Sequence, residues 1–527
     1  MSRLVSALSG VAVPQRSMTL LGHPAGLFLL FLVEMWERFS YYGMRGLLVL
    51  YLVQATHPVP DASGFVNPGR GWSRADASLL YGWYTGLAYL MPIVGGWIAD
   101  RLLGTHRSMI VGGLVIALGH TVLALSGVGT LASSDLGLSV FVFGLGLIVI
   151  GTGHFKPCVS VMVGQLYEAG DARRDGAFTI FYMGINLGAF LAAFVCGTLG
   201  ERVGWHWGFG SAAVGMLAGL GLYTSLRARV LGTIGAPPPG RANASLACLA
   251  GGIGTAALVA ALFHTGRLAM LGSVVSRRAA VLVLIVLAVA WAVRFVGALA
   301  PAERGPVTTI FVFMLFNAVF WLAFEQAGSS LNLFTDMRTD RMLGSFEVPT
   351  TWFQSVNAGL IFLLAPLFAA LWSWLGRRGR DPQQAVKIAL GLVFLGLGYV
   401  FMVAAGRVAL DPAVKAPMVF VLATYFWHTV GELCLSPTGL SYVTRAAPAR
   451  YVSLLMGVWF VSTFLANLGG GLVAAQVEAI ERGEIALPWH LGGQADFFML
   501  FVVSAGVAAL VILGLAPWLR RLARGVA

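Results

Sequence analysis

The chain has few charged side chains, and this scarcity determines its class. Only 11% of the 527 residues are charged, 58% are hydrophobic, and the mean hydropathy is +0.82. A soluble domain carries about 25% charged residues, so a string of soluble domains is disfavoured. Apolar runs of about 20 residues, long enough to cross a bilayer as helices, recur along the chain. The sequence therefore predicts an all-α polytopic membrane protein.

Cysteine and lysine are also scarce. The four cysteines lie within apolar runs and lack the spacing of metal ligands, so we interpret them as small buried residues. Of the 34 basic residues, only Lys156, Lys387 and Lys415 are lysines. The net charge of +12 comes mainly from arginines that flank apolar runs. This pattern is typical of a membrane protein and predicts no nucleic-acid partner.

The apolar runs predict fourteen spans joined by short loops. They lie near 26–54, 76–101, 106–127, 135–165, 176–199, 207–228, 243–264, 279–299, 306–335, 350–376, 384–406, 415–444, 450–477 and 494–519. Arginine and lysine collect on the side that holds both termini, which predicts cytoplasmic ends in an inner membrane. The segment between the seventh and eighth spans breaks this bias, so we expect those two spans to form an accessory hairpin.

Six predicted spans precede the hairpin and six follow it. We therefore predict an N-terminal six-helix bundle (1–230), a linker with the accessory hairpin (231–304) and a C-terminal six-helix bundle (305–527). This organisation, with a site between the bundles at the middle of the bilayer, resembles the major facilitator superfamily. The segment GGWIADRLLGTHR (95–107) resembles the loop motif of that superfamily.

The first span carries an unusual polar stretch, EMWERFSYYGMR (34–45). On a helix its polar side chains fall within about 140° of the circumference. A charge at the centre of a span costs roughly 2.5–3.5 kcal/mol, so scattered charges would be poorly tolerated. We interpret the stretch as one stripe that faces a wet cavity and whose charges pair; a purely structural salt-bridge network is the alternative. The stripe comprises Glu34, Glu37, Arg38, Tyr41, Tyr42 and Arg45.

Further charges lie within spans of both halves. The first six spans add Lys156, whereas the later spans contribute Glu325 and Glu432. A cavity between the halves would have one mainly basic wall and one acidic wall. An extended dipeptide spans about 7 Å between its termini, and its carboxylate and ammonium groups match these two walls. A zwitterion is therefore the expected ligand.

The sequence resembles the proton-dependent oligopeptide transporter (POT) family. The resemblance rests on the first-span motif ExxERFxYYG, on FTIFYMGINLGAF (178–190), GGWIADRLLG and FKP, and on FEQAGSSLNLF and GELCLSPTGLSYV. These segments run from the first predicted span to the twelfth. The resemblance implies a proton-coupled symporter that imports di- and tripeptides by alternating access. Cys158 stands after FKP, where members of the family often have asparagine.

The resemblance also implies roles for individual residues. Residues implied in proton coupling are Glu34, Glu37, Arg38, Lys156 and Glu325. Residues implied in peptide binding are Arg45, Tyr41, Tyr42, Tyr81 (or Tyr89), Lys156, Asn186, Asn357, Glu432 and Trp459. Gate salt bridges are implied for Arg45, Glu325, Lys156 and Glu432.

Other functions remain open at this point. A symporter of nitrate or of a peptide-like drug would share the fold, and a drug exporter would share the twelve core spans. A membrane enzyme would need a metal cluster, nucleophile elbow or phosphate loop, and the sequence has none of these motifs. We expect a monomer in a lipid bilayer with no cofactor or metal, protons serving as the coupling ion.

Overall fold

The computed structural model describes residues 18–60, 64–168, 170–171, 173–237, 240, 243–267 and 274–523. The chain ends, for which a cytoplasmic location is predicted, lie largely outside these residues. Short strands pair at the margins of an otherwise helical chain. They are β1 (Thr19–Leu20) with β2 (His23–Pro24), β4 (Met342–Leu343) with β5 (Phe346–Glu347), and β3 (Thr339–Asp340) parallel to β6 (Ala416–Pro417).

The N-terminal half is built of long helices interrupted by short π-helical and 3-10 turns. Ser73 and Ser134 begin two of them, since each hydroxyl accepts a hydrogen bond from a backbone N–H of the first turn. The elements are α2 (Ala25–Val53), α3 (Arg74–Ile98), η1 (Ala99–Leu103), α4 (Gly104–Leu125), η2 (Gly129–Ala132), α5 (Asp135–Gln165), α6 (Arg174–Ala192), η3 (Ala193–Gly197), α7 (Thr198–Arg202) and α8 (Trp205–Val230).

The remaining helices comprise two that follow the first half and those of the C-terminal half. The two are α9 (Ser245–His264) and α11 (Val274–Gly297). The C-terminal half contains α12 (Pro301–Phe324), η4 (Glu325–Gly328), α13 (Ser330–Arg338), η5 (Thr350–Trp352), α14 (Phe353–Arg377), α15 (Gln384–Val408), α16 (Val419–Ala446), η6 (Ala449–Tyr451), α17 (Val452–Ala474), α18 (Val477–Glu481) and α19 (Gln494–Leu522).

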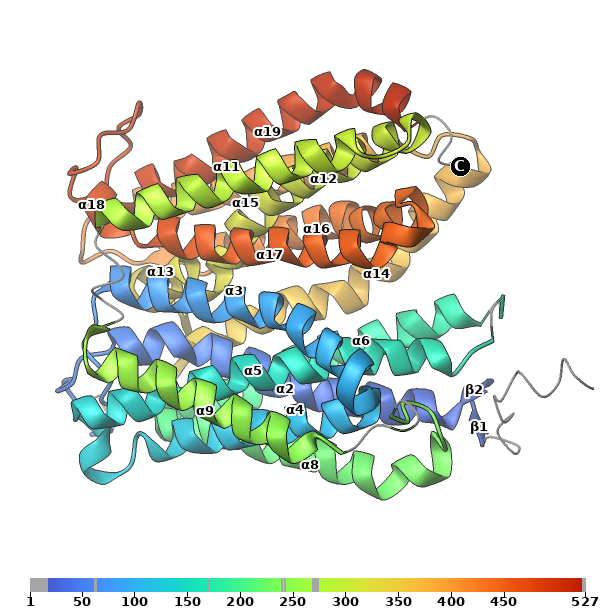
Figure 1. Ribbon diagram of the computed structural model, residues 1–527. Helices are drawn as coiled ribbons and strands as arrows, with labels where there is room; N and C mark the ends of the chain where they lie inside the picture. Colours follow the sequence, from blue (N-terminus) through green and yellow to red (C-terminus); the bar gives the residue numbers. More distant parts are fainter. Residues whose placement is uncertain are drawn as a thin grey trace, which may run out of the picture.

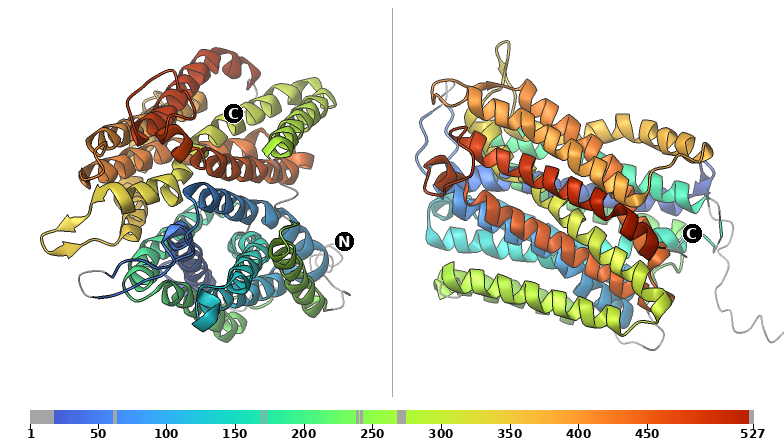
Figure 2. Two further views of the ribbon diagram at one scale, coloured as in Figure 1. Left: turned by 90° about the vertical axis from the view of Figure 1, so that its left-hand side faces the viewer. Right: turned by 90° about the horizontal axis from the view of Figure 1, so that it is seen from above.

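The long helices lie side by side in two groups, one for each half of the chain (Figure 1). Both ends of the described chain lie at the right in this view, and we call this the terminal end. The opposite end carries α18 and the β4–β5 hairpin, and we call it the far end (Figures 1 and 2). Each half has its own hydrophobic core, one from α12, α15, α16 and α19, the other from α2, α3, α5 and α8.

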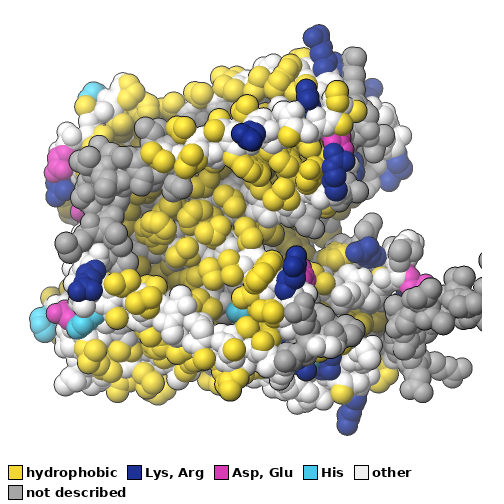
Figure 3. All heavy atoms as spheres, in the orientation of Figure 1, with side chains coloured by type: hydrophobic (Ala, Val, Ile, Leu, Met, Phe, Trp, Pro, Cys, Tyr) yellow, Lys and Arg dark blue, Asp and Glu magenta, His cyan; other side chains and the backbone are white. Residues whose placement is uncertain are grey.

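Within the described residues, ten helical runs are long and apolar enough to cross a membrane. One run, Arg74–Leu125, comprises both α3 and α4, and α2 is not among the ten because it carries four charged side chains. Hydrophobic side chains cover the middle of the molecule, while basic side chains gather toward the terminal end (Figure 3). The predicted polytopic helical class is confirmed, whereas the count of fourteen spans stays a prediction.

The predicted accessory hairpin is not a packed pair of helices. Helix α9 packs on α4 and α5 of the first half, where Ala256 joins a cluster with Val111 and Leu147. Helix α11 packs on α12, and its Phe295 contacts the ring of Phe311. The two helices lie on different halves of the molecule (Figure 1). Arginine counts show on which side a loop lies, but they do not show which apolar surface each helix covers.

The two halves approach most closely where α3 meets α17. A Cβ atom on Gly82 would lie 2.9 Å from the Cα of Gly471, so only glycine allows this backbone approach. Phe464 lies about two turns before Gly471 on α17, against Gly86. These contacts lie in the part of α3 near the far end, whereas a notch separates the halves at the terminal end (Figure 3).

We expect Gly471→Leu to destabilise this contact. Overpacking of a closely fitted site costs about 1–3 kcal/mol, so the thermal midpoint of the purified protein should fall. The control is Gly457→Leu on the same helix, because a Cβ at Gly457 has no neighbour within 4 Å. Intrinsic fluorescence during heating measures both variants, and equal midpoints would contradict the close contact.

Candidate functional site

The polar stripe of α2 forms a compact cluster of charges. The guanidinium of Arg38 lies between two carboxylates: its Nε is 3.3 Å from Glu34 Oε1, and its Nη2 donates to Glu37 Oε1 at 2.7 Å. The same Nε also contacts the second oxygen of Glu37. These side chains and Arg45 are 1–6% exposed. The stripe was predicted to face a wet cavity. In this structure its charged residues are covered by neighbouring helices, and Arg38 pairs with the two carboxylates of the stripe.

Arg45, the last residue of the stripe, contacts the other half of the protein. Its Nη2 lies 2.6 Å from Glu325 Oε2, and its Nε donates to the hydroxyl of Tyr81 at 2.7 Å. Tyr81 belongs to α3, where it had been expected to line a side-chain pocket. The hydroxyl instead accepts from Arg45 and lies directly against Gly328. A buried ion pair therefore joins the two halves near the middle of the helices.

A break in the helix places Glu325 at this position. Helix α12 ends at Phe324, and the 3-10 turn η4 redirects the chain before α13 begins. Asn332 of α13 then donates to the carbonyl oxygen of Gly46 at 3.0 Å. The break therefore brings two polar side chains of the C-terminal half onto consecutive residues of α2.

Lys156 lies near the stripe on α5 but has a different partner. Its Nζ is 3.7 Å from the centroid of the Tyr89 ring, a cation–π contact. Among the described residues, no carboxylate lies within ion-pairing distance of this amine, so the gate pair expected with Glu432 is not formed. Glu432 instead accepts a hydrogen bond from Asn357. The two halves are separated by a notch at the terminal end (Figure 3).

The predicted amino-end ligands are only partly gathered. Asn357 Nδ2 lies 2.9 Å from both Glu432 Oε2 and Thr429 Oγ1, which fixes the carboxylate on α16 against α14. Asn186 of α6 donates to the carbonyl oxygen of Tyr182 on its own helix. The structure thus joins Glu432 with Asn357 and leaves Asn186 on the opposite half. Thr429 was missed, although its spacing of three residues from Glu432 places it on the same helical face.

The predicted aromatic residues differ in position. Tyr42 is half-buried, and the guanidinium of Arg45 lies 5.7 Å from its ring centroid. Tyr41 is buried in the core of the first half, where its ring stacks on Tyr84. Trp459 is buried in the core of the second half. Of the three, Tyr42 is the one that lines the pocket described next.

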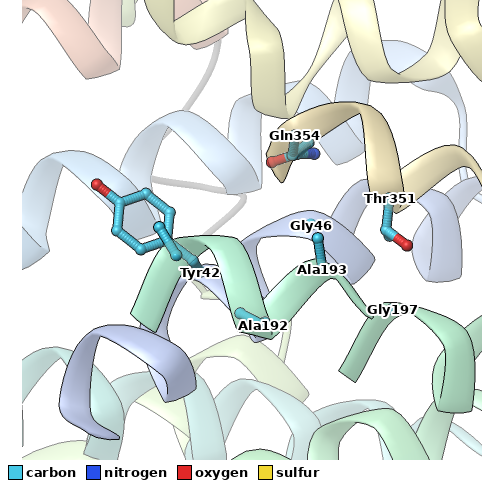
Figure 4. Close-up of a pocket in the computed structure, with 9 residues that line it drawn as sticks. Tyr42, Gly46, Ala192, Ala193, Gly197, Thr351 and Gln354 are labelled. Atoms are coloured by element: carbon cyan, nitrogen blue, oxygen red, sulfur yellow. The ribbon is translucent and has the colours of Figure 1, made fainter. Parts of the chain in front are cut away.

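A small pocket lies between the halves beside Tyr42 (Figure 4). Its floor consists of small residues of α2, α6 and η3, and its roof consists of Thr351 and Gln354. The amide nitrogen of Gln354 is buried and lacks a hydrogen-bond partner. The floor residues are Gly43, Gly46, Ala189, Ala192, Ala193 and Gly197. The pocket therefore combines close backbone approach with one free polar donor.

The far end is closed by contacts that sequence reasoning missed. Arg74 at the start of α3 forms ion pairs with Glu478 and Glu481 of α18, both at 2.8 Å. Arg338 also lies 3.7 Å from Glu481. This contact was not predicted from the sequence, because no periodic pattern extends across a loop. The available signal was that Glu478 and Glu481 follow one apolar span and Arg74 precedes a different apolar span.

Two helical halves joined by a buried ion pair at mid-depth are typical of a secondary transporter. The family profile of the POT family matches residues 106–490. A peptide transporter of Yersinia enterocolitica is 37% identical over 476 residues, 88% of this chain and 89% of its own. A di-/tripeptide transporter of Lactococcus lactis subsp. cremoris is 36% identical, covering 84% of this chain and 88% of its own.

A solved structure agrees with this assignment. The crystal structure of a peptide transporter POT in complex with sulfate has a TM-score of 0.80 and 35% sequence identity, and covers 99% of each chain. The chain belongs to the POT family.

We expect Arg74→Gln to loosen the far end. The ion pairs of Arg74 are partly exposed, and such pairs contribute up to about 1 kcal/mol, so the open population should rise about fivefold. Ser78, which lines a cavity with Arg74 and is 1% exposed, supplies the probe as Ser78→Cys. The rate at which an impermeant thiol reagent labels Ser78→Cys measures the opening.

The matched control is Arg482→Gln. Arg482 pairs with Glu484 at the same end, but both side chains are more than half exposed. Its labelling rate should equal that of the parent Ser78→Cys protein, and a high salt concentration should mimic Arg74→Gln. A labelling rate unchanged by Arg74→Gln would show that the ion pairs of Arg74 do not hold the far end shut.

Proposed function

We propose that this protein is a proton-coupled symporter that imports di- and tripeptides by alternating access. The observation that carries the proposal is the buried Arg45–Glu325 pair, which joins the halves on the path between them. Membership of the POT family and the peptide-transporter names of its relatives support the substrate class. The same charges would be hard to explain in a cation exporter, which has no need of a basic wall.

The proposed coupling step is an exchange of partners. A proton that enters from outside neutralises Glu325, or one of Glu34 and Glu37, and so releases a basic side chain. The peptide carboxylate then binds this base, and the halves rock until the terminal end releases both. One charge that crosses about 100 mV is worth roughly 2.3 kcal/mol, close to fifty-fold accumulation.

The remaining site residues receive binding roles on the same basis. Arg45 and Lys156 would face the peptide carboxylate, and Glu432 with Asn357 and Asn186 would hold the amino end. The contact between Asn357 and Glu432 supports this arrangement, because it fixes the carboxylate in the second half. Tyr42 would contact a peptide side chain, whereas the burial of Tyr41 and Trp459 argues for support of the site from behind.

We further propose an inner-membrane location with cytoplasmic termini and a functional monomer. Basic side chains gather toward the terminal end (Figure 3), as the positive-inside rule requires of a cytoplasmic face. In that orientation the far end faces outward, so the structure corresponds to a state closed to the outside. Each monomer contains both walls of the site.

Glu325→Gln should abolish proton-driven uptake and spare peptide exchange. The amide cannot release a proton, so the partner exchange at Arg45 no longer follows the gradient. Labelled dipeptide uptake into proteoliposomes measures the first activity, and counterflow without a proton gradient measures the second. Glu484→Gln, an exposed carboxylate at the far end, is the control. Full proton-driven uptake by Glu325→Gln would rule out this coupling role.

The two charged walls should also limit the length of the substrate. A free amino acid cannot reach both walls, while a dipeptide spans about 7 Å. Unlabelled di-alanine should therefore compete with labelled dipeptide in proteoliposomes, and free alanine at the same concentration should not. Di-alanine with an amidated carboxyl end serves as the control for the basic wall. Competition by free alanine equal to that by di-alanine would contradict the arrangement.

A further inference from the structure

Glu201 makes an unusual set of contacts across the two halves. It lies near the end of α7 in the first half, and its carboxylate accepts three hydrogen bonds from the second half. The donors are the backbone N–H groups of Thr350 and Thr351, both at 2.8 Å, and the Thr351 hydroxyl at 2.6 Å. Both threonines are buried. Neither Glu201 nor Thr350 has a role in the proposed proton or peptide binding, whereas Thr351 lines the small pocket.

The contact serves the start of a helix. The first N–H groups of a helix have no partner within it, and a side chain or water must satisfy them. Neither η5 nor α14 has a side-chain cap of its own. Glu201 supplies the missing acceptor from the other half of the protein, and its negative charge also suits the positive end of the helix dipole. An opening of the far end that parts α7 from η5 would leave these donors unpaired.

The π-helical turn η3 brings Glu201 to this position. It lies between α6 and α7, and such turns often mark functional positions in helices. Gly197 at its end lies directly against the Thr351 hydroxyl, so any side chain there would collide with the threonine. Trp352 Nε1 donates to Thr198 Oγ1 at 2.8 Å. The Gly197 backbone, the contact of the Trp352 ring with Thr198 and the Glu201 carboxylate therefore hold the start of α14 against residues 197–201.

The seated turn is also the roof of the small pocket. Thr351 and Gln354 cover it, and Ala193 and Gly197 of η3 form part of its floor (Figure 4). Because Glu201 binds Thr351 directly, it determines how the roof lies over Tyr42 and Gly46. A change at Glu201 thus affects both the closure of the far end and the shape of the site.

We propose that Glu201 is a positioning residue that latches the far end shut by capping η5 and α14 in trans. The latch holds Thr351 and Gln354 as the roof over the site. The proposal rests on the alternating-access motion of the proposed function. It adds that the contacts of Glu201 stabilise the closed state of the far end. It acts beside the Arg45–Glu325 pair but needs no proton, since its partners are backbone and hydroxyl donors.

Distances between spin labels test the latch. Val128→Cys and Val414→Cys place labels on exposed loops of the two halves at the far end, with the half-exposed Cys248 replaced by serine. Double electron–electron resonance on the full chain in nanodiscs should show one short distance. Glu201→Ala should raise the long-distance population at least tenfold, because three donors lose their acceptor. Glu201→Asp, which keeps the charge, should restore part of the short distance.

Thr351→Val is the matched partner variant. It removes the hydroxyl donor and keeps both backbone donors, so its shift should be smaller than that of Glu201→Ala. Glu484→Gln should leave the distances unchanged. Unaltered distances in Glu201→Ala, or a mere loss of folded protein that Glu201→Asp does not repair, would overturn the latch. Because no substrate is added, this result is independent of dipeptide uptake by the parent protein, which tests the proposed function.

Discussion

A charge inside a bilayer needs a partner, and the Arg45–Glu325 pair satisfies this need across two separately packed halves. Arg45 stands on α2 and Glu325 on the turn η4, so neither half can neutralise its own charge at this point. The pair also buries the Tyr81 hydroxyl against Gly328. Removing one partner of a buried pair costs several kcal/mol. In the proposed mechanism the two halves therefore part here only when a proton or a ligand replaces the lost partner.

The contacts that close the far end differ in kind with their depth. The Gly82 and Gly471 backbones meet at about the depth of the ion pair, because Gly82 follows Tyr81, whose hydroxyl binds Arg45. Glu201 and Arg74 lie nearer the rim of the far end. The ion pairs of Arg74 are partly exposed, so salt weakens them, whereas the hydrogen bonds of Glu201 to buried threonines are protected. The closed state therefore does not depend on one interaction, and the ion pair can respond to protonation while the rim keeps the halves aligned.

Periodicity along single helices predicted much of this site. The stripe of α2, the mid-span Lys156 and the carboxylates Glu325 and Glu432 were all visible as polar residues in apolar runs. What could not be predicted is pairing between helices. Lys156 lies on an aromatic ring and not on Glu432, and Glu201 binds backbone N–H groups that leave no trace in side-chain spacing. The packing of α9 and α11 on different halves was not predicted for the same reason: the sequence of an apolar helix does not indicate which helices it packs against.

The three bases near the site differ in how fully they are neutralised. Arg38 is held by two carboxylates, and Arg45 by Glu325 and a tyrosine hydroxyl, whereas Lys156 has only the face of Tyr89. A cation–π contact is weaker than a buried ion pair. Of these three, Lys156 is therefore the base that an arriving carboxylate can reach without first displacing an acid. In the proposed mechanism Arg45 becomes available only after Glu325 takes a proton, so the order of the two contacts would couple peptide binding to protonation.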